Sequence, residues 1–262
     1  MQNPSNLEQD WPPELRQAKG RVSKDLQRLV MLRSVLQGIF EHETVRNAFD
    51  GTYRGNVFKL IETSLLRDAV STLDRLFSKP GGKGPAANLS LLYVADVFNG
   101  TSAVEQSYKA YSRKWGAVSV ATECQQTRNR EATAREQKDW AAVEASIENV
   151  NNYADGPFFG LIRTFRSEWI SHSVVSSRDR KTYRVSDDYE LTFTDLFEAI
   201  DEGVSVGVKA YDAFFRVGLS VEDLGAYWRT FGDAFWAMSI GDSQLADEIE
   251  GKLYSDDDWL EG

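Results

Sequence analysis

Residues 12–41 read PPELRQAKGRVSKDLQRLVMLRSVLQGIFE, and this stretch decides the fold class of the chain. Its large apolar residues recur at steps of three or four after an opening step of seven: Leu15, Val22, Leu26, Leu29, Leu32, Leu36 and Phe40. That period matches one face of an α-helix, and proline is tolerated in the first turn of a helix but not deeper. We therefore predict a long amphipathic helix that begins after Pro12 and Pro13.

The same period marks further helices on both sides of the one linker-like stretch, SKPGGKGP at residues 78–85. Glycine and proline favour a loop there. Apolar residues predict a second long helix at 57–76, before the linker, and Asn88-Leu89-Ser90 opens a short helix that runs to about Phe98. Residues 101–155 are rich in Ala, Glu, Gln, Lys and Arg with a weak apolar stripe. This composition predicts one or two exposed helices, packed across the bundle or against a partner.

Two more helices follow a polar connection at residues 178–190, which has mixed strand propensity. Thr194 and Asp195 predict the start of one helix, and Ser220 with Asp223 resembles a capping box that opens the other. The last helix carries phenylalanine and tryptophan residues at helical spacing, predicted to be core or dimer contacts, including Phe231, Phe235 and Trp236. No alternation of apolar and polar residues is long enough to predict a sheet.

The predicted fold is all-α, an up-and-down helical bundle over residues 1–240 with a helical insertion at about 80–155. Residues 241–262 form an acidic C-terminal tail. Eight acidic residues and one lysine lie between Asp242 and Glu261, so this tail carries −7 of the formal charge of −10. An acidic protein of this kind is not expected to coat nucleic acid without sequence preference.

The single cysteine, Cys124, has no second thiol for an intramolecular disulfide, which fits a reducing compartment. The N-terminal residues lack an apolar signal core, and no stretch reaches the roughly 20 apolar residues of a membrane span. We therefore expect a cytoplasmic protein that does not contact a membrane.

The residues best suited to chemistry lie on a third core helix, which Pro157 starts. One predicted apolar stripe runs along it and ends in an ionisable group: Phe158, Ile162, Phe165, Trp169 and His172. At about 100° per residue, Arg166 lies about 80° from the centre of the stripe, on the side opposite His172. Arg166 and His172 can therefore both face a groove beside the core. Glu168, one turn earlier, can accept a hydrogen bond from the imidazole and favour its charged form. The alternative is a core histidine bonded to backbone. The other histidine, His42, is expected on the surface.

Residues 161–173, LIRTFRSEWISHS, resemble the signature of the HEPN superfamily, an arginine and a histidine separated by four to six residues. Five residues separate Arg166 from His172, and Ser167 fills the position of the polar residue that commonly follows the arginine. Residues 60–77 are similar to the early helix of the abortive-infection (AbiU-type) branch. One departure is Val174, where toxins paired with a nucleotidyltransferase have tyrosine.

This resemblance implies a metal-independent endoribonuclease without a cofactor, active as a homodimer whose two motifs meet in one cleft. Arg166 and His172 are then catalytic, with Ser167 and Glu168 in support. The substrate is RNA, either transfer RNA or single-stranded RNA. The implied setting is prokaryotic antiviral defence or a toxin–antitoxin system, with an antitoxin or regulatory partner. The sequence also has no metal-ligand spacing of histidine, cysteine and carboxylates.

A basic patch adjoins the motif, because six bases and only two acids lie between Arg163 and Arg184. The predicted phosphate contacts are Arg163, Arg178, Arg180, Lys181 and Arg184. A solvated polar loop is the competing interpretation. The acidic tail is interpreted as a solubilising end or as a cover for this patch. A non-catalytic helical module that binds RNA or protein is the alternative function.

Overall fold

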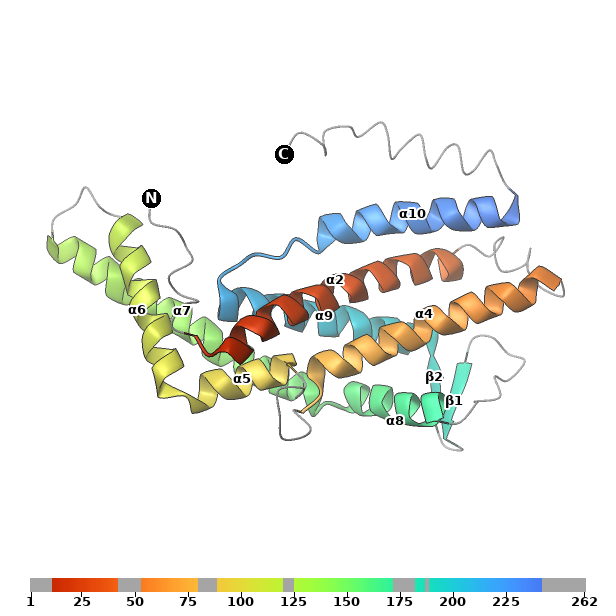
Figure 1. Cartoon of the computed structure of the whole chain (residues 1–262), viewed down its shortest axis with the longest axis horizontal. Helices are drawn as coiled ribbons and strands as arrows, with labels where there is room; N and C mark the ends of the chain where they lie inside the picture. The colour runs from red at the N-terminus through yellow and green to blue at the C-terminus, as the bar shows by residue number, and fades with distance from the viewer. Residues whose placement is uncertain are drawn as a thin grey trace. The chain divides into compact units, whose positions relative to one another are not determined.

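The computed structural model describes residues 11–41, 53–79, 89–119, 125–171, 182–186 and 189–241. In these ranges the chain forms eight α-helices and one two-stranded ribbon (Figure 1). The helices are α2 (Pro13–Glu41), α4 (Tyr53–Phe77), α5 (Leu91–Gly100), α6 (Ser102–Ser119), α7 (Gln125–Ala154), α8 (Pro157–Ser171), α9 (Phe193–Phe215) and α10 (Glu222–Ile240). The predicted all-α helical-bundle class is confirmed. None of the described helices is long and apolar enough to cross a membrane.

Local signals in the sequence set several helix ends as predicted. Helix α2 begins at Pro13, and α4 ends at Phe77, just before the linker. Ser90 caps α5, since its hydroxyl accepts a 3.1 Å hydrogen bond from the amide of Tyr93. Several predicted features lie outside the described ranges, namely His42, Cys124, the centre of the linker and the tail residues 242–262.

Two predicted caps differ in detail from the structure. Helix α9 begins earlier than predicted, because Thr192 rather than Thr194 pairs with Asp195: the Thr192 amide donates to the Asp195 carboxylate at 2.9 Å, and the Asp195 amide donates to the Thr192 hydroxyl at 3.1 Å. At the start of α10, the Ser220 hydroxyl donates to the Asp223 carboxylate at 2.6 Å. The N-cap of α10 is Val221, without a side-chain hydrogen bond, so the predicted capping box is not formed there.

A short antiparallel ribbon corrects the expectation that the chain has no sheet. Strand β1 (Thr182–Ser186) pairs with β2 (Tyr189–Thr192), and the register changes between Arg184 and Ser186. Each strand is too short to show the alternation that a larger sheet requires, and pairing across a hairpin is what stabilises it. The mixed strand propensity of the connection was the only sequence signal for this ribbon.

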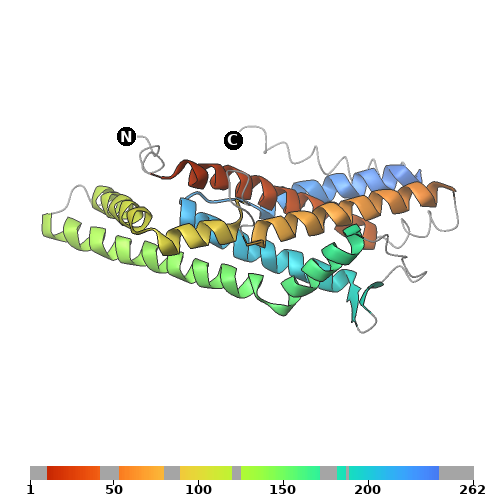
Figure 2. The same cartoon turned by 60° about the horizontal axis from the view of Figure 1, so that its bottom comes forward.

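The chain divides into two compact units. The first comprises Met1–Asp25, Asp74–Leu161 and Glu202–Leu219; the second comprises Leu26–Leu73, Ile162–Asp201 and Ser220–Gly262. In the first unit, α6 lies along α7, and α5 packs against both (Figures 1 and 2). The helices predicted as exposed at 101–155 therefore bury one face within their own unit.

An aromatic cluster forms much of the core of the first unit. The rings of Phe98 and Phe214 stack with centroids 5.0 Å apart, and Tyr108 meets Phe98 edge-on at 5.7 Å. Trp11 packs on Phe98 and on Phe215, with centroids 6.3 and 5.7 Å apart. Such offset and edge-to-face pairs stabilise a core beyond the area that they bury.

In the second unit, α10 packs closely on the C-terminal half of α2. A Cβ atom at Gly232 would lie 3.0 Å from the Cα of Val35, so the two backbones approach so closely that a larger residue would have to push Val35 aside by a few tenths of an ångström. The buried Trp236 indole donates to the carbonyl of Val35 at 3.2 Å and meets the ring of Phe58 edge-on at 5.3 Å. This contact joins α10 to both α2 and α4.

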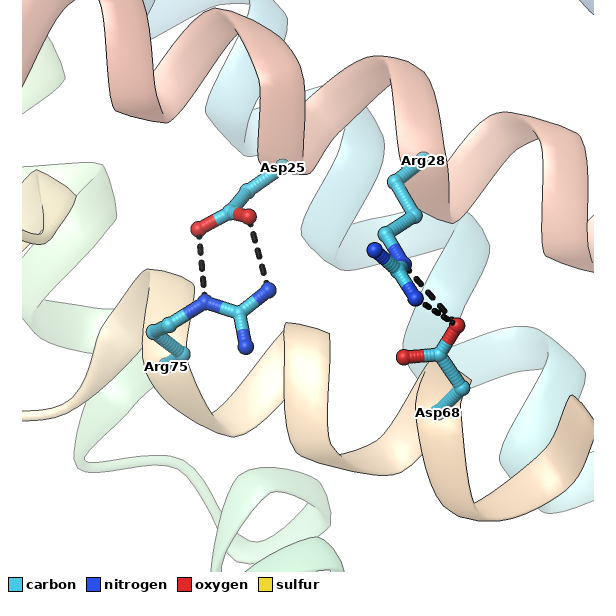
Figure 3. A network of polar contacts seen from close by, with 4 residues as sticks. All are labelled: Asp25, Arg28, Asp68 and Arg75. Atoms are coloured by element: carbon cyan, nitrogen blue, oxygen red, sulfur yellow. Dashed lines mark hydrogen bonds and ion pairs between the residues drawn. The ribbon is translucent and has the colours of Figure 1, made fainter. Parts of the chain in front are cut away.

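Ion pairs also connect α2 and α4, and Figure 3 shows one from each unit. In the first unit, two nitrogens of Arg75 donate to the two carboxylate oxygens of Asp25 at 2.7 and 2.9 Å. In the second unit, Arg28 donates to one oxygen of Asp68 at 2.6 to 2.8 Å. The Asp25 pair is bidentate and largely buried, whereas the Arg28 side chain is 53% exposed.

Candidate functional site

Helix α8 carries the residues that the sequence singled out for chemistry. It begins at Pro157, whose missing N–H needs no partner in a first turn, and the amide of Gly160 donates to the carbonyl of Gly156 at 3.1 Å. The buried side chains are Phe159, Ile162 and Phe165. Phe158 was predicted on the buried stripe but is 38% exposed. The buried face of α8 is therefore rotated relative to the predicted one.

Three of the predicted site residues have described side chains on α8. Arg166 and Ser167 are exposed, and Arg163, one turn before Arg166, is half-buried. Residues three apart on a helix lie on the same side, so the two arginines share one side of α8. Glu168 lies in the same helix, but its side chain is outside the described part of the structure. The structure thus brings Arg163 and Arg166 together.

The remaining predicted residues are not brought together by the described structure. His172, Arg178, Arg180 and Lys181 lie outside the described ranges. Arg184 lies in β1, where its backbone partner across the ribbon is Glu190.

A small cavity in the first unit was not predicted from the sequence. It has a volume of about 240 Å³ and lies where α7 gives way to α8, with α9 alongside. Its polar lining comes from Asn149, Asn152, Tyr153 and Glu202, and none of the predicted site residues lines it. Burial, and then the nearby Glu202, raise the pKa of Tyr153, so its hydroxyl remains neutral at physiological pH.

A buried polar network in the same unit was also not predicted from the sequence. Arg216 lies 2.6 Å from Asp139, which also accepts from Arg135 at 3.2 Å. The hydroxyl of Tyr108 donates to the carbonyl of Ala213 at 2.6 Å, and burial raises the pKa of Tyr108. Burial disfavours the charge on Arg216, but Tyr108 and Asp139 outweigh this effect and raise its pKa. No local pattern predicts this network, because its members come from α6, α7 and the end of α9.

Among the described residues, no group of three or more histidine, cysteine, aspartate or glutamate side chains is arranged to hold a metal ion. Comparison of the chain with known protein families, with curated proteins and with solved structures finds no match. The functional assignment therefore depends on the residues of α8 and on the sequence that follows them.

Proposed function

We propose that this protein is a metal-independent endoribonuclease of HEPN type. The observation that supports the proposal most is the exposure of Arg166 on α8, a late helix of an all-α chain, six residues before His172. In a solvent-facing position a guanidinium can meet a phosphodiester. Ser167, also exposed, follows it as in the resembled motif.

The chemistry follows from the two side chains. The imidazole of His172 removes the proton from a ribose 2′-hydroxyl, and the 2′-oxygen attacks the adjacent phosphorus. The bond from phosphorus to the 5′-oxygen breaks, and that oxygen takes a proton from a protonated His172 imidazole, which returns to its neutral form. The guanidinium of Arg166 stabilises the negative charge that develops on the phosphoryl oxygens. The products are a 2′,3′-cyclic phosphate and a 5′-hydroxyl end.

The wider parts of the proposal concern partners and setting. Two copies of the chain form the active site, with one motif from each copy facing the same cleft. Transfer RNA or single-stranded RNA is the substrate, and Arg163 and the bases of residues 178–184 contact its phosphates. The enzyme acts in the prokaryotic cytoplasm, in antiviral defence or as a toxin held in check by an antitoxin or regulatory partner.

The decisive experiment is RNA cleavage by the purified full chain in the presence of a chelator. We expect wild-type protein to cut transfer RNA or single-stranded RNA and to leave cyclic phosphate ends. His172→Ala should lower the rate by about 10² to 10⁴, the usual contribution of a general acid or base. His42→Ala is the matched control, since these are the only two histidines, and it should cut at the wild-type rate.

Undiminished cleavage by His172→Ala would overturn the proposal. Binding of RNA without cleavage by the wild-type chain would also contradict it and would favour the alternative, a helical module that binds RNA or protein. In that case Arg166→Ala should weaken binding, and no product ends should appear at any protein concentration.

A further inference from the structure

The cavity of the first unit, where α7 gives way to α8 beside α9, has no part in the proposed cleavage reaction (Figure 2). Its volume of about 240 Å³ is below the roughly 300 to 1,000 Å³ of sites for drug-sized ligands. The cavity is therefore the right size for a small molecule or for one long side chain of a partner protein.

Three polar side chains that line the cavity can turn toward a ligand. Asn149 and Asn152 lie three residues apart on α7 and so share one side of that helix, and Glu202 lines the cavity from α9. All three residues are exposed. Within the part of the chain that the structure describes, none of these three side chains has a hydrogen bond or an ion pair. Two amide groups and a carboxylate are thus available at one place.

The charge of the cavity favours a cation. Among the described residues that line it, Glu202 is the only charged one, so the lining carries a formal charge of −1. Asn152 and Tyr153 belong to the last turn of α7, and the negative end of a helix dipole also attracts cations. Pro157 starts α8 without an N–H, which removes one donor that would favour an anion there. A phosphate or carboxylate ligand is disfavoured for the same reasons.

Apolar side chains complete the lining. Phe158 on α8 is 38% exposed and Val206 on α9 is half-buried, and both line the cavity. The buried ring of Tyr153 packs on Phe77 and Phe159, with centroids 4.4 and 5.7 Å apart, so this wall is held firmly. An exposed aromatic ring attracts a cation that comes within about 6 Å of its centroid. The lining therefore suits a cation that also carries an apolar stem.

We infer that this cavity binds a small organic cation, an alkylguanidinium or alkylammonium group. The carboxylate of Glu202 binds the charged group, and the amide oxygens of Asn149 and Asn152 accept its remaining N–H groups. Phe158 and Val206 contact its stem. A guanidinium fits best, because its planar fork can donate to both oxygens of one carboxylate.

The site is separate from Arg166 and His172, and the inference does not depend on RNA cleavage. The same cationic group is found in free guanidines and amines and in the arginine side chain of a partner protein. Both sources present the same chemistry to Glu202, so the experiment includes a probe for each.

Titration of the full chain, followed by NMR, tests the inference. Butylguanidinium and butylammonium should shift the side-chain amide signals of Asn149 and Asn152, with a Kd on the order of 1 mM for such small ligands. Butanol and butyrate have the same stem without the positive charge. They should bind at least about tenfold more weakly, because the Glu202 carboxylate then gains no charged donor.

Substitutions then assign the binding to this cavity. Glu202→Gln removes the charge and should weaken butylguanidinium binding by about tenfold or more. Glu131→Gln is the matched control, since it makes the same change at an exposed glutamate near the other end of α7, and it should leave the Kd unchanged. Phe158→Leu should weaken binding by about two- to fivefold through loss of the ring.

The outcomes either support the inference or overturn it. A short capped peptide with one arginine that binds at least as tightly as butylguanidinium supports a partner's arginine as the ligand, and weaker binding of the peptide supports a free cation. No shift of the Asn149 and Asn152 signals at cation concentrations on the order of 10 mM would overturn the inference. Equal losses in Glu202→Gln and Glu131→Gln would also overturn it, because they would show a general attraction to an acidic protein. Tighter binding of guanosine, a neutral base rich in donors, would overturn the preference for a cation.

Discussion

The guanidinium of Arg216 lies 2.6 Å from the buried carboxylate of Asp139, and the backbone of Arg216 adopts φ 56°. This is the left-handed region, in which a residue with a side chain costs about 1 to 2 kcal/mol and glycine costs little. Arg216 directly follows the last residue of α9, where helices often place glycine. The ion pair with Asp139 is what an arginine supplies at this position and a glycine does not.

Two substitutions at Arg216 separate the backbone cost from the ion pair. Arg216→Ala and Arg216→Gly both remove the guanidinium, but only glycine relieves the left-handed backbone. We expect Arg216→Ala to lower the free energy of unfolding by about 2 kcal/mol or more, because the buried Asp139 loses its 2.6 Å ion pair with Arg216 and keeps the longer one with Arg135. Arg216→Gly should be about 1 kcal/mol more stable than Arg216→Ala in urea unfolding. Equal stability of the two variants would show that the backbone is not strained.

Two glycines of α10 should respond oppositely to alanine. At Gly232 a Cβ atom would lie 3.0 Å from the backbone of Val35, so Gly232→Ala should destabilise by about 1 to 3 kcal/mol. At Gly225 the nearest atom is a methyl group of Val30 at 3.4 Å, an ordinary contact. Gly225→Ala should therefore be neutral or stabilise by up to about 1 kcal/mol through helix propensity. Thermal unfolding of the two variants checks this, and a destabilised Gly225→Ala would contradict it.

The two ion pairs of Figure 3 should differ in strength. Asp25→Ala leaves the partly buried guanidinium of Arg75 without its bidentate partner and should cost about 2 to 3 kcal/mol. Asp68→Ala removes a pair whose arginine is about half exposed and should cost less than about 1 kcal/mol. Urea unfolding at low and high salt checks both values, and only the Asp68 effect should fade as salt is raised. Similar losses at both sites would contradict the expectation.

Alkaline pH should destabilise the first unit through its buried tyrosines. Burial raises the pKa of both Tyr108 and Tyr153 above the value of about 10 expected in the unfolded chain. The folded state therefore favours the neutral hydroxyls. Their contribution to stability is complete below about pH 9 and is lost as pH rises beyond 10, at up to about 1.4 kcal/mol per pH unit for each tyrosine.

Unfolding in urea between pH 8 and 11 measures this loss. Tyr153→Phe should make the free energy of unfolding fall less steeply with pH above 10, because one of the two buried tyrosines no longer titrates. Tyr108→Phe should reduce it as well, and should also lower stability at neutral pH by about 1 kcal/mol, because the carbonyl of Ala213 loses its donor. A Tyr153→Phe variant with the wild-type slope would contradict the prediction.

If the proposed cleavage reaction holds, it should depend on the shape as well as the charge of Arg166. Arg166→Ala should lower the cleavage rate by about 10² to 10³, and Arg166→Lys should restore only part of it, because an ammonium group does not reproduce the planar fork. Arg130→Ala, an exposed arginine of α7, is the matched control and should leave the rate unchanged. Full activity of Arg166→Lys would show that the reaction needs the positive charge of Arg166 but not the planar shape of its guanidinium.

Prediction from the sequence succeeded where the signal is local. Proline at the start of α2 and α8, the glycine-rich stretch after α4 and the Ser90 cap all act within one turn of chain, so they position helix ends by themselves. Prediction failed where two neighbouring residues fit the helical period equally well, so that the sequence did not decide which of them is buried. Either Phe158 or Phe159 continues an apolar stripe through Ile162, and only the structure selects Phe159.

The sequence by itself determined that this chain is all-α and where most of its helices run, because helical periodicity and chain-breaking residues need no distant partner. It also singled out Arg166 on a late helix. Only the tertiary structure decided which helical faces are buried, that Arg216 reaches Asp139, and that the aromatic residues at 227, 231 and 235 remain exposed instead of joining the core. These features depend on segments far apart in the chain, whose packing is set by shape and burial rather than by local spacing.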